Sequence, residues 1–108
     1  GSGNTVIGAS ADVGAGNLTN ATAIGANATV TQSNSVVLGG VTGENGGTDT
    51  NVGIGTTAPK AKLDVRNGDV FVGTLGAGVI LKSPNGSCFR LTVSDAGALT
   101  AISVTCPQ

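Results

Sequence analysis

The chain has 108 residues of narrow composition: 19 are glycine, 2% are aromatic, and histidine, tryptophan, tyrosine and methionine are absent. Without histidine, the chain has no imidazole base for a catalytic triad and no usual zinc site. With so few aromatic side chains, recognition of nucleic acid by base stacking is poorly supported. The composition argues against an enzyme, a bound metal or cofactor, and a nucleic-acid partner. It favours a repetitive, β-rich protein.

The formal net charge of −1 is unevenly distributed along the chain. Residues 1–59 hold three acidic and no basic side chains, whereas residues 60–108 hold five basic and three acidic ones, a net charge of +2. This break predicts two modules, residues 1–58 and residues 59–108. An excess of two positive charges is too small to indicate nucleic-acid binding. No apolar run is long enough to span a membrane, so we expect no membrane insertion.

A short unit recurs four times in the first half of the chain. Each copy has a small or β-branched residue, then Ile or Leu, then a glycine, and these glycines are Gly8, Gly25, Gly39 and Gly55. The steps between them are 17, 14 and 16 residues. β-branched residues suit extended backbone, while glycine and asparagine suit turns. The period predicts a β-roll or solenoid with two short strands per coil, one of them at residues 28–31.

Two of these units, Asn20–Ala28 and Asn34–Gly39, resemble the head repeats of trimeric autotransporter adhesins. Those heads are left-handed parallel β-rolls in which three chains form one cylinder, and the resemblance covers about residues 4–58. The segment 51–59, followed by Lys62–Val65 and Gly68, is similar to distal fibres of phage tails and of phage-like contractile injection systems. Such fibres are also trimers, and their tips bind receptors on a target cell. The resemblance therefore implies an all-β homotrimer: a trimeric left-handed parallel β-roll head followed by a β cap.

The second module is predicted to form a small antiparallel sheet. Alternating apolar and polar residues indicate strands, and the Asn67-Gly68 pair indicates a hairpin turn. Such a sheet would close the open edge of the roll, which otherwise invites aggregation. The expected strands are residues 61–65, 69–72, 79–82, 88–93 and 99–106.

Cys88 and Cys106 are the only cysteines. An even pair in a small non-enzymatic chain predicts a disulfide and an oxidising location, and the alternative is two buried free thiols. Pairing the apolar faces, with Phe89 opposite Val104, conflicts with direct opposition of the cysteines, because a shift of one residue exchanges the two faces of a strand. A bulge at Gly97, or a bend of the chain end toward Cys88, would resolve the conflict.

Acidic pairs offer two further readings, glycosidase carboxylates and a calcium site. The pairs are Asp64 with Asp69, and Glu44 with Asp49. No aromatic platform for a sugar accompanies either pair, and the calcium ligands are too few. Solvated loop and turn residues are the favoured interpretation, and no metal is expected.

We therefore expect a non-enzymatic homotrimeric fibre tip or adhesin head that attaches to a cell surface. Its receptor would be a cell-surface glycan or protein. Its location would be extracellular, on a bacterial surface, a filament or a phage-like particle. The alternative is a structural stalk or extracellular filament module with no ligand of its own. Polarity and expected exposure select three binding loops, residues 42–49, 84–87 and 94–98, with Glu44, Asn45, Asp49, Asn85, Ser87 and Asp95 as candidate binding residues.

Overall fold

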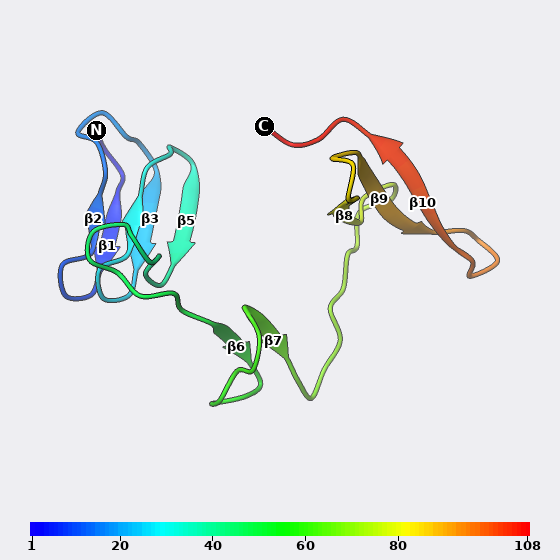
Figure 1. Ribbon diagram of the computed structural model, residues 1–108, viewed down its shortest axis with the longest axis horizontal. Coiled ribbons are helices and arrows are strands. Elements are labelled where there is room, and N and C mark those ends of the chain that lie inside the picture. The colour runs from blue at the N-terminus through cyan, green and yellow to red at the C-terminus, as the bar shows by residue number, and fades with distance from the viewer. The chain divides into compact units, whose positions relative to one another are not determined.

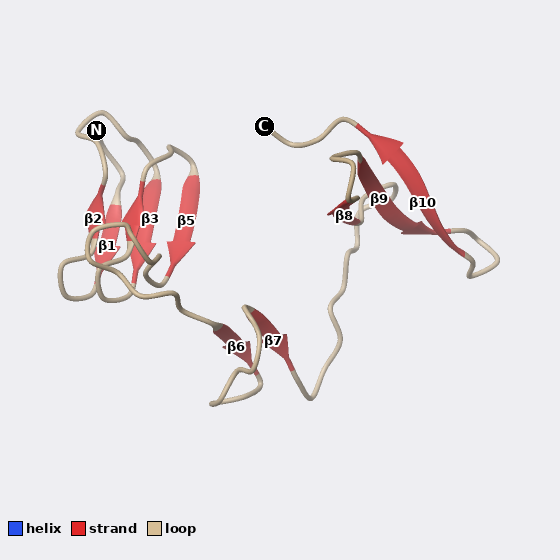
Figure 2. Ribbon diagram, viewed as in Figure 1, coloured by secondary structure: helices blue, strands red, loops and turns tan.

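The chain folds entirely into strands and loops. The computed structural model describes all 108 residues and contains ten strands and no helix (Figure 2). It divides into two compact units, residues 1–69 and residues 70–108. The first unit is a parallel β-solenoid and the second contains a small antiparallel sheet, which confirms the predicted all-β roll followed by a small antiparallel sheet.

The first coils of the solenoid contain two parallel ladders (Figure 1). One ladder joins β1, β3 and β5, and the other joins β2 and β4. Ile7 pairs with Ile24 and Ile24 with Leu38, at offsets of 17 and 14 residues. These offsets equal the steps between the first three repeat glycines, so the repeat spacing sets the register. The strands are β1 (Thr5–Ile7), β2 (Asp12–Val13), β3 (Ala21–Ile24), β4 (Thr29–Val30) and β5 (Ser35–Leu38).

The repeat glycines stack in a row where these strands end. Gly8 and Gly25 have φ angles of 128° and 124°, which side-chain-bearing residues rarely adopt. A Cβ atom on Gly8 would come within 2.6 Å of the carbonyl carbon and oxygen of Gly25. A Cβ atom on Gly25 would lie 3.0 Å from the Cα of Gly39. Both the backbone angle and the space therefore require glycine at these positions.

Asparagines form a matching row where the strands begin. The Asn4 amide donates to the carbonyl oxygen of Leu18 at 2.8 Å, and its Oδ1 accepts from the N–H of Ala21 at 2.9 Å. The Asn20 amide donates to the Asn34 Oδ1 at 3.1 Å, and both of these asparagines have positive φ. Asparagine tolerates this conformation better than most residues. The polar turns are thus bonded from coil to coil.

The core of the solenoid is narrow and built from small side chains. Ala21 and Ala23 of β3 are fully buried, whereas the residues between and after them point outward. Val30 is the largest fully buried side chain. The core contains only aliphatic side chains, and no aromatic residue occurs in this unit. The buried cluster comprises Leu18, Ala21, Ala23, Ala28 and Val30, with Ala11, Val13 and Val37 packed against it.

The fourth repeat unit does not extend the first ladder. Strand β6 (Val52–Ile54) pairs in parallel with β7 (Leu63–Val65), and no ladder joins β6 to β5. The offset from β6 to β7 is 11 residues, since Val52 pairs with Leu63. The coil is tight inside, because a Cβ atom on Gly53 would lie 2.7 Å from the carbonyl oxygen of Thr56. This last coil is therefore shorter than those before it.

The pairing of β7 with β6 places residues 59–69 in the solenoid unit, whereas the charge break predicts a boundary after residue 58. It also shows that the predicted hairpin at Asn67-Gly68 is wrong. Asn67 has a φ of 61°, and its amide donates to the carbonyl oxygen of Gly55 at 3.2 Å. This bond joins adjacent parallel coils, as the asparagines of the earlier coils do.

The second unit is a three-stranded antiparallel sheet in the order β10-β9-β8. Strands β8 (Val79–Lys82) and β9 (Cys88–Val93) have the predicted bounds, and β10 (Leu99–Val104) ends two residues earlier than predicted. The predicted strand at residues 69–72 is absent: these residues belong to no ladder. Val70, Phe71 and Val72 are of types that favour strands, but they pair with no neighbouring strand in the chain.

Both connections in this sheet are the same kind of turn. In the first, Gly86 N–H donates to the carbonyl oxygen of Ser83 at 2.9 Å, and Ser83 N–H donates to that of Ser87 at 2.8 Å. The turn at residues 94–98 repeats these two bonds at the same lengths. Gly86 and Gly97 have φ angles of 89° and 85°. Each is a three-residue hairpin loop that ends in a glycine bulge.

The bulge at Gly97 gives β9 and β10 a register that differs from the predicted pairing of apolar residues. Cys88, and not Phe89, lies opposite Val104. Cys106 lies two residues beyond Val104, so that alternation puts it on the same face of the sheet as Cys88. Neither predicted pairing is therefore found: the cysteines are not directly opposed, but they share a face and are joined diagonally.

Candidate functional site

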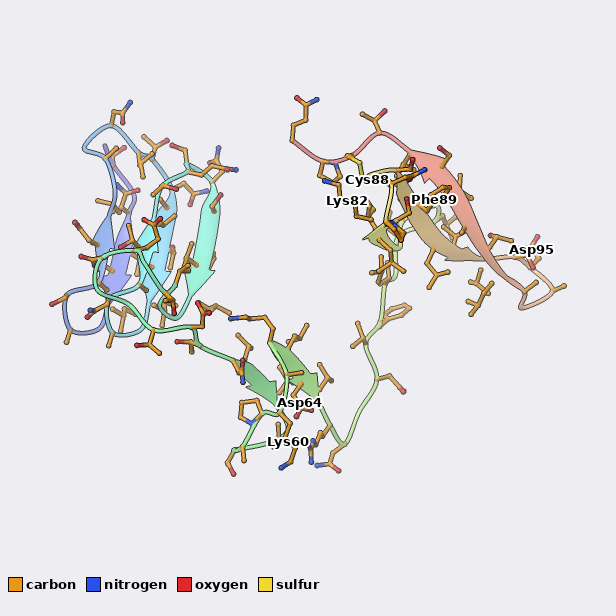
Figure 3. All side chains as sticks on the ribbon, in the orientation of Figure 1. Lys60, Asp64, Lys82, Cys88, Phe89 and Asp95 are labelled. Carbon is orange, nitrogen blue, oxygen red and sulfur yellow. A yellow bond between two sulfur atoms is a disulfide. The ribbon has the colours of Figure 1, made fainter.

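Cys88 and Cys106 form the predicted disulfide, with 5.2 Å between their Cα atoms (Figure 3). Cys88 begins β9 and, at 5% exposure, is the only buried residue of the second unit. The Sγ of Cys106 lies 3.5 Å from the carbonyl oxygen of Gly86. The bond therefore fastens the segment after β10 to the turn before β9. A disulfide is consistent with an oxidising environment.

The loop at residues 42–49 is closed by a reciprocal pair of hydrogen bonds. Asp49 Oδ1 accepts from the N–H of Thr42 at 2.9 Å, and Thr42 Oγ1 accepts from the N–H of Asp49 at 3.1 Å. The Thr42 backbone N–H lowers the pKa of the Asp49 carboxyl, with a smaller lowering from the charge of Lys62. The Asp49 side chain thus serves the loop itself, although the carboxylate lies at the surface.

Asn45 ties the same loop to the first coil. Its amide donates to the carbonyl oxygen of Ser10 at 2.6 Å. Glu44 uses its backbone in the turn, and its exposed carboxylate makes no hydrogen bond or ion pair within the chain. Between the loop and the ends of β3 and β5 is a hollow of about 340 Å³ lined by Gly25, Ala26, Asn27, Gly39, Gly46, Gly47, Thr48 and Thr50. No charged side chain lines it, so its walls offer mainly backbone groups and small side chains.

The turn that contains Asn85 and Ser87 is bonded internally as well. Asn85 Oδ1 accepts from the Ser83 hydroxyl at 2.6 Å and from the N–H of Ser87 at 3.1 Å. The Ser83 hydroxyl also lies 3.1 Å from the carbonyl oxygen of Ser87. These bonds hold the Asn85 side chain over its own turn.

Asp95 lies at the tip of the other turn, where Figure 3 shows it at the far end of the β9–β10 hairpin. In this turn the Ser94 Oγ accepts from the N–H of Ala98 at 3.0 Å, while Asp95 forms no ion pair. The two turns lie at opposite ends of the six-residue β9, roughly 20 Å apart at the usual rise per residue. The second unit therefore does not bring Asn85 and Ser87 together with Asp95 in a single site.

Asp64 has an organising role that the sequence does not reveal. It sits in β7, its side chain is 13% exposed, and it accepts from Arg66 Nε and Nη2 at 3.1 Å each and from the N–H of Lys60 at 2.9 Å. The bond from Arg66, followed by that from Lys60, lowers the pKa of the Asp64 carboxyl. Figure 3 shows Lys60 and Asp64 near each other. The interpretation of Asp64 as a solvated turn residue is wrong; it holds the last coil closed.

The outer face of the solenoid carries apolar residues that composition alone does not locate. Alternation along β3 and β5 buries Ala23 and partly buries Val37, and it turns Ile24 and Leu38 outward. Leu38 is 51% exposed, and Ile7 and Ile24 extend the row across the ladder. We call this surface the outer stripe; it consists of Ile7, Ile24, Val36 and Leu38.

No family model, curated protein or solved structure matches this chain. The chain has no helix of the length and apolarity that a membrane span requires. No three side chains among histidine, cysteine, aspartate and glutamate gather as they would around a metal ion. The features available for a function are therefore the polar loops, the outer stripe and the exposed faces of the second unit.

Proposed function

We propose that the chain is a non-enzymatic homotrimeric fibre tip or adhesin head that attaches to a cell-surface glycan or protein receptor. The observation that carries the proposal is the outer stripe. Apolar side chains are usually buried, yet here Ile7, Ile24 and Leu38 form a row on the outside, with Val36 beside it. Contiguous exposed apolar surface on a soluble protein marks an interaction site.

Self-association follows from the shape of this surface and the size of the chain. The stripe is a flat ladder face without charge, made of Ile7, Ile24, Val36 and Leu38. A chain of 10.3 kDa with a core of small residues buries little apolar surface on its own. Copies of one chain related by rotational symmetry present the same patch to a common axis. The resemblance of the repeats to trimeric adhesin heads supports three copies.

Attachment through the loops follows from the same symmetry. A trimer presents three copies of each loop around the axis, so that weak individual contacts combine into avidity. Glu44 and Asp95 are the candidate residues whose exposed carboxylates have no partner in the chain. These two side chains are therefore available to a receptor without breaking an internal bond. The disulfide supports an extracellular location.

One observation favours a structural stalk as the second candidate function. Asn45, Asp49 and Asn85 use their side chains to hold their own loops. A module with no ligand would need stable turns and nothing more. In this alternative the outer stripe still makes the trimer, and the loops only close the coils.

Two measurements test the proposal. Light scattering should give three times the chain mass of 10.3 kDa, and a stable monomer would overturn the assembly. A screen against cells and immobilised glycans should then find a target for the trimer. Glu44→Ala or Asp95→Ala should reduce its binding, whereas Thr57→Ala, at an exposed position outside the three loops, should not. A trimer that binds no target, or that binds equally well in both loop variants, would favour the stalk.

A further inference from the structure

The sheet of the second unit has two unlike faces. Antiparallel register puts Val79 and Leu81 of β8 in line with Leu91 and Phe89 of β9. The same register continues across β10 through Leu99, Ala101 and Ser103. We call this surface the apolar sheet face; apart from Ser103, all of its residues are apolar, namely Val79, Leu81, Phe89, Leu91, Val93, Leu99 and Ala101.

Most residues of the apolar sheet face are exposed in the second unit. Val93 is 65% exposed and Leu99 73%, and Val79, Leu81 and Leu91 are exposed as well. The opposite face carries charged and hydroxyl-bearing side chains, and other residues of the unit lie against part of it. It holds Lys82, Arg90 and the hydroxyl pair of Thr92 and Thr100, whose oxygens lie 2.9 Å apart, together with the aliphatic residues Ile80, Ile102 and Val104. It also carries the disulfide, and residues 71–77 form a hollow of about 500 Å³ with Thr92, Val93 and Ile102.

The second unit is incomplete without a partner for the apolar sheet face. Residues 70–108 contain one buried residue, Cys88, and one disulfide. Units of about this size usually need a disulfide, a metal or association with other chains to be stable. A surface needed for folding has to be covered permanently. That requirement fits a partner made together with the chain and does not fit a receptor that is met later.

The chemistry of the apolar sheet face favours its own copies as that partner. The face has no charged residue, so it offers nothing to select a charged ligand. Copies of one chain that already meet through the outer stripe are held at high local concentration, because the same backbone continues into the second unit. Flat apolar faces arranged around an axis exclude water from one another, as the two sheets of a β-sandwich do.

We propose that the apolar sheet face packs against the same face of neighbouring copies of the chain and forms the interchain core of the second unit. This inference rests on the homo-oligomer of the proposed function. If the apolar sheet face is buried between copies, the opposite face, which carries Lys82, Arg90, Thr92 and Thr100, is exposed to solvent. A receptor that meets the sheets of the assembly would therefore contact this basic, hydroxyl-bearing surface.

Site-specific photocrosslinking in the full chain tests the inference. p-Benzoylphenylalanine in place of Phe89 is a conservative change on the apolar sheet face, and a second probe replaces Val93 in case the first disturbs folding. The matched control carries the same group in place of Thr100 on the other face. Irradiation should give interchain adducts several-fold more abundantly from positions 89 and 93 than from position 100. Peptide mapping should place them on residues 79–101 of another copy.

The outcomes separate this inference from the proposed function. A trimer by light scattering that gives no interchain adducts from positions 89 and 93 overturns the inference and leaves the assembly through the outer stripe standing. Adducts only to residues 1–69, or equal yields from positions 93 and 100, also overturn it. Interchain adducts on residues 79–101 in an assembly that binds no target support the inference while the receptor function fails.

Discussion

Cys88 and Cys106 are bonded diagonally across the end of a ladder in which the direct partner of Cys88 is Val104. The bond therefore holds the chain at Cys106, two residues after the end of β10, to the start of β9. It closes a loop with a sequence separation of 18. The loop contains all of β9 and β10 together with the turn that joins them. The second unit has almost no buried core, so this covalent tie is a large part of what maintains its fold.

Removing the disulfide should destabilise the second unit by about 3 kcal/mol in the chain-entropy model for a loop of this length. The double variant Cys88→Ser with Cys106→Ser should therefore melt at a lower temperature than the native chain, with the loss confined to residues 70–108. Hydrogen exchange read by mass spectrometry locates the loss. Reductant should reproduce the effect in the native chain and do nothing to the double variant. Unchanged protection of β9 and β10 would show that the bond is not needed.

The solenoid register could be predicted from the sequence because parallel coils repeat their turns. Gly8, Gly25 and Gly39 mark the same point in successive coils, and the ladder offsets equal their spacing. The pattern fails at β6, since the partner of Ile54 is Val65, which is followed by Arg66 where the other units have glycine. No local signal identifies that partner.

The prediction of a strand at residues 69–72 was wrong for a related reason, since the sequence does not show whether a segment has a partner strand. Strand propensity describes the side chains of a segment, but a strand also needs a neighbour with free backbone groups. Val70, Phe71 and Val72 have a high strand propensity and yet remain exposed and unpaired. The bounds of β8 and β9 were predictable, because glycine turns mark the ends of these hairpin strands.

The positions of the candidate loops were predictable from polarity, whereas their internal bonding was not. Asparagine, aspartate and serine in a turn bond to nearby backbone groups as readily as to a ligand. The sequence alone does not distinguish Asp49, whose carboxylate accepts a hydrogen bond from Thr42, from Glu44, whose carboxylate has no partner in the chain. That distinction depends on where each side chain lies relative to the backbone.

Glycine at position 8 should be essential to the stacking of the coils. Gly8→Ala puts a Cβ atom against the Gly25 carbonyl and a side chain at a φ of 128°. Strain of this kind costs about 1–3 kcal/mol, so the solenoid should melt at a lower temperature. Gly16→Ala is the matched control, since no atom lies within 4 Å of its added Cβ and its φ is not in the positive range. Circular dichroism during heating gives the melting temperature of each variant. Equal melting temperatures for Gly8→Ala and Gly16→Ala would contradict the close stacking of the coils.

A charge placed on the outer stripe should break the assembly. Ile24→Glu adds a carboxylate at the middle of the stripe, between Ile7 and Leu38. Burying it in an apolar interface is unfavourable without a partner, so the mass by light scattering should fall from the trimer to the single chain. Thr31→Glu, at an exposed position after β4, carries the same charge away from the stripe and should remain trimeric. An Ile24→Glu variant that stays trimeric would show that the assembly does not depend on the outer stripe.

The loop at residues 42–49 should loosen in acid. The N–H of Thr42 lowers the pKa of Asp49, so the folded value lies below the unfolded one. The bond therefore favours the closed loop fully above the unfolded value of about 3.9 and is lost as pH falls through the folded value. The Thr42 amide signal, followed by NMR from about pH 6 to about pH 2, should move with a midpoint below that of an ordinary aspartate. Asp49→Asn keeps an acceptor oxygen that does not titrate, so this shift should vanish, whereas Glu44→Gln should retain it. A midpoint at or above the ordinary value in the native chain would mean that the carboxylate does not hold the loop in solution.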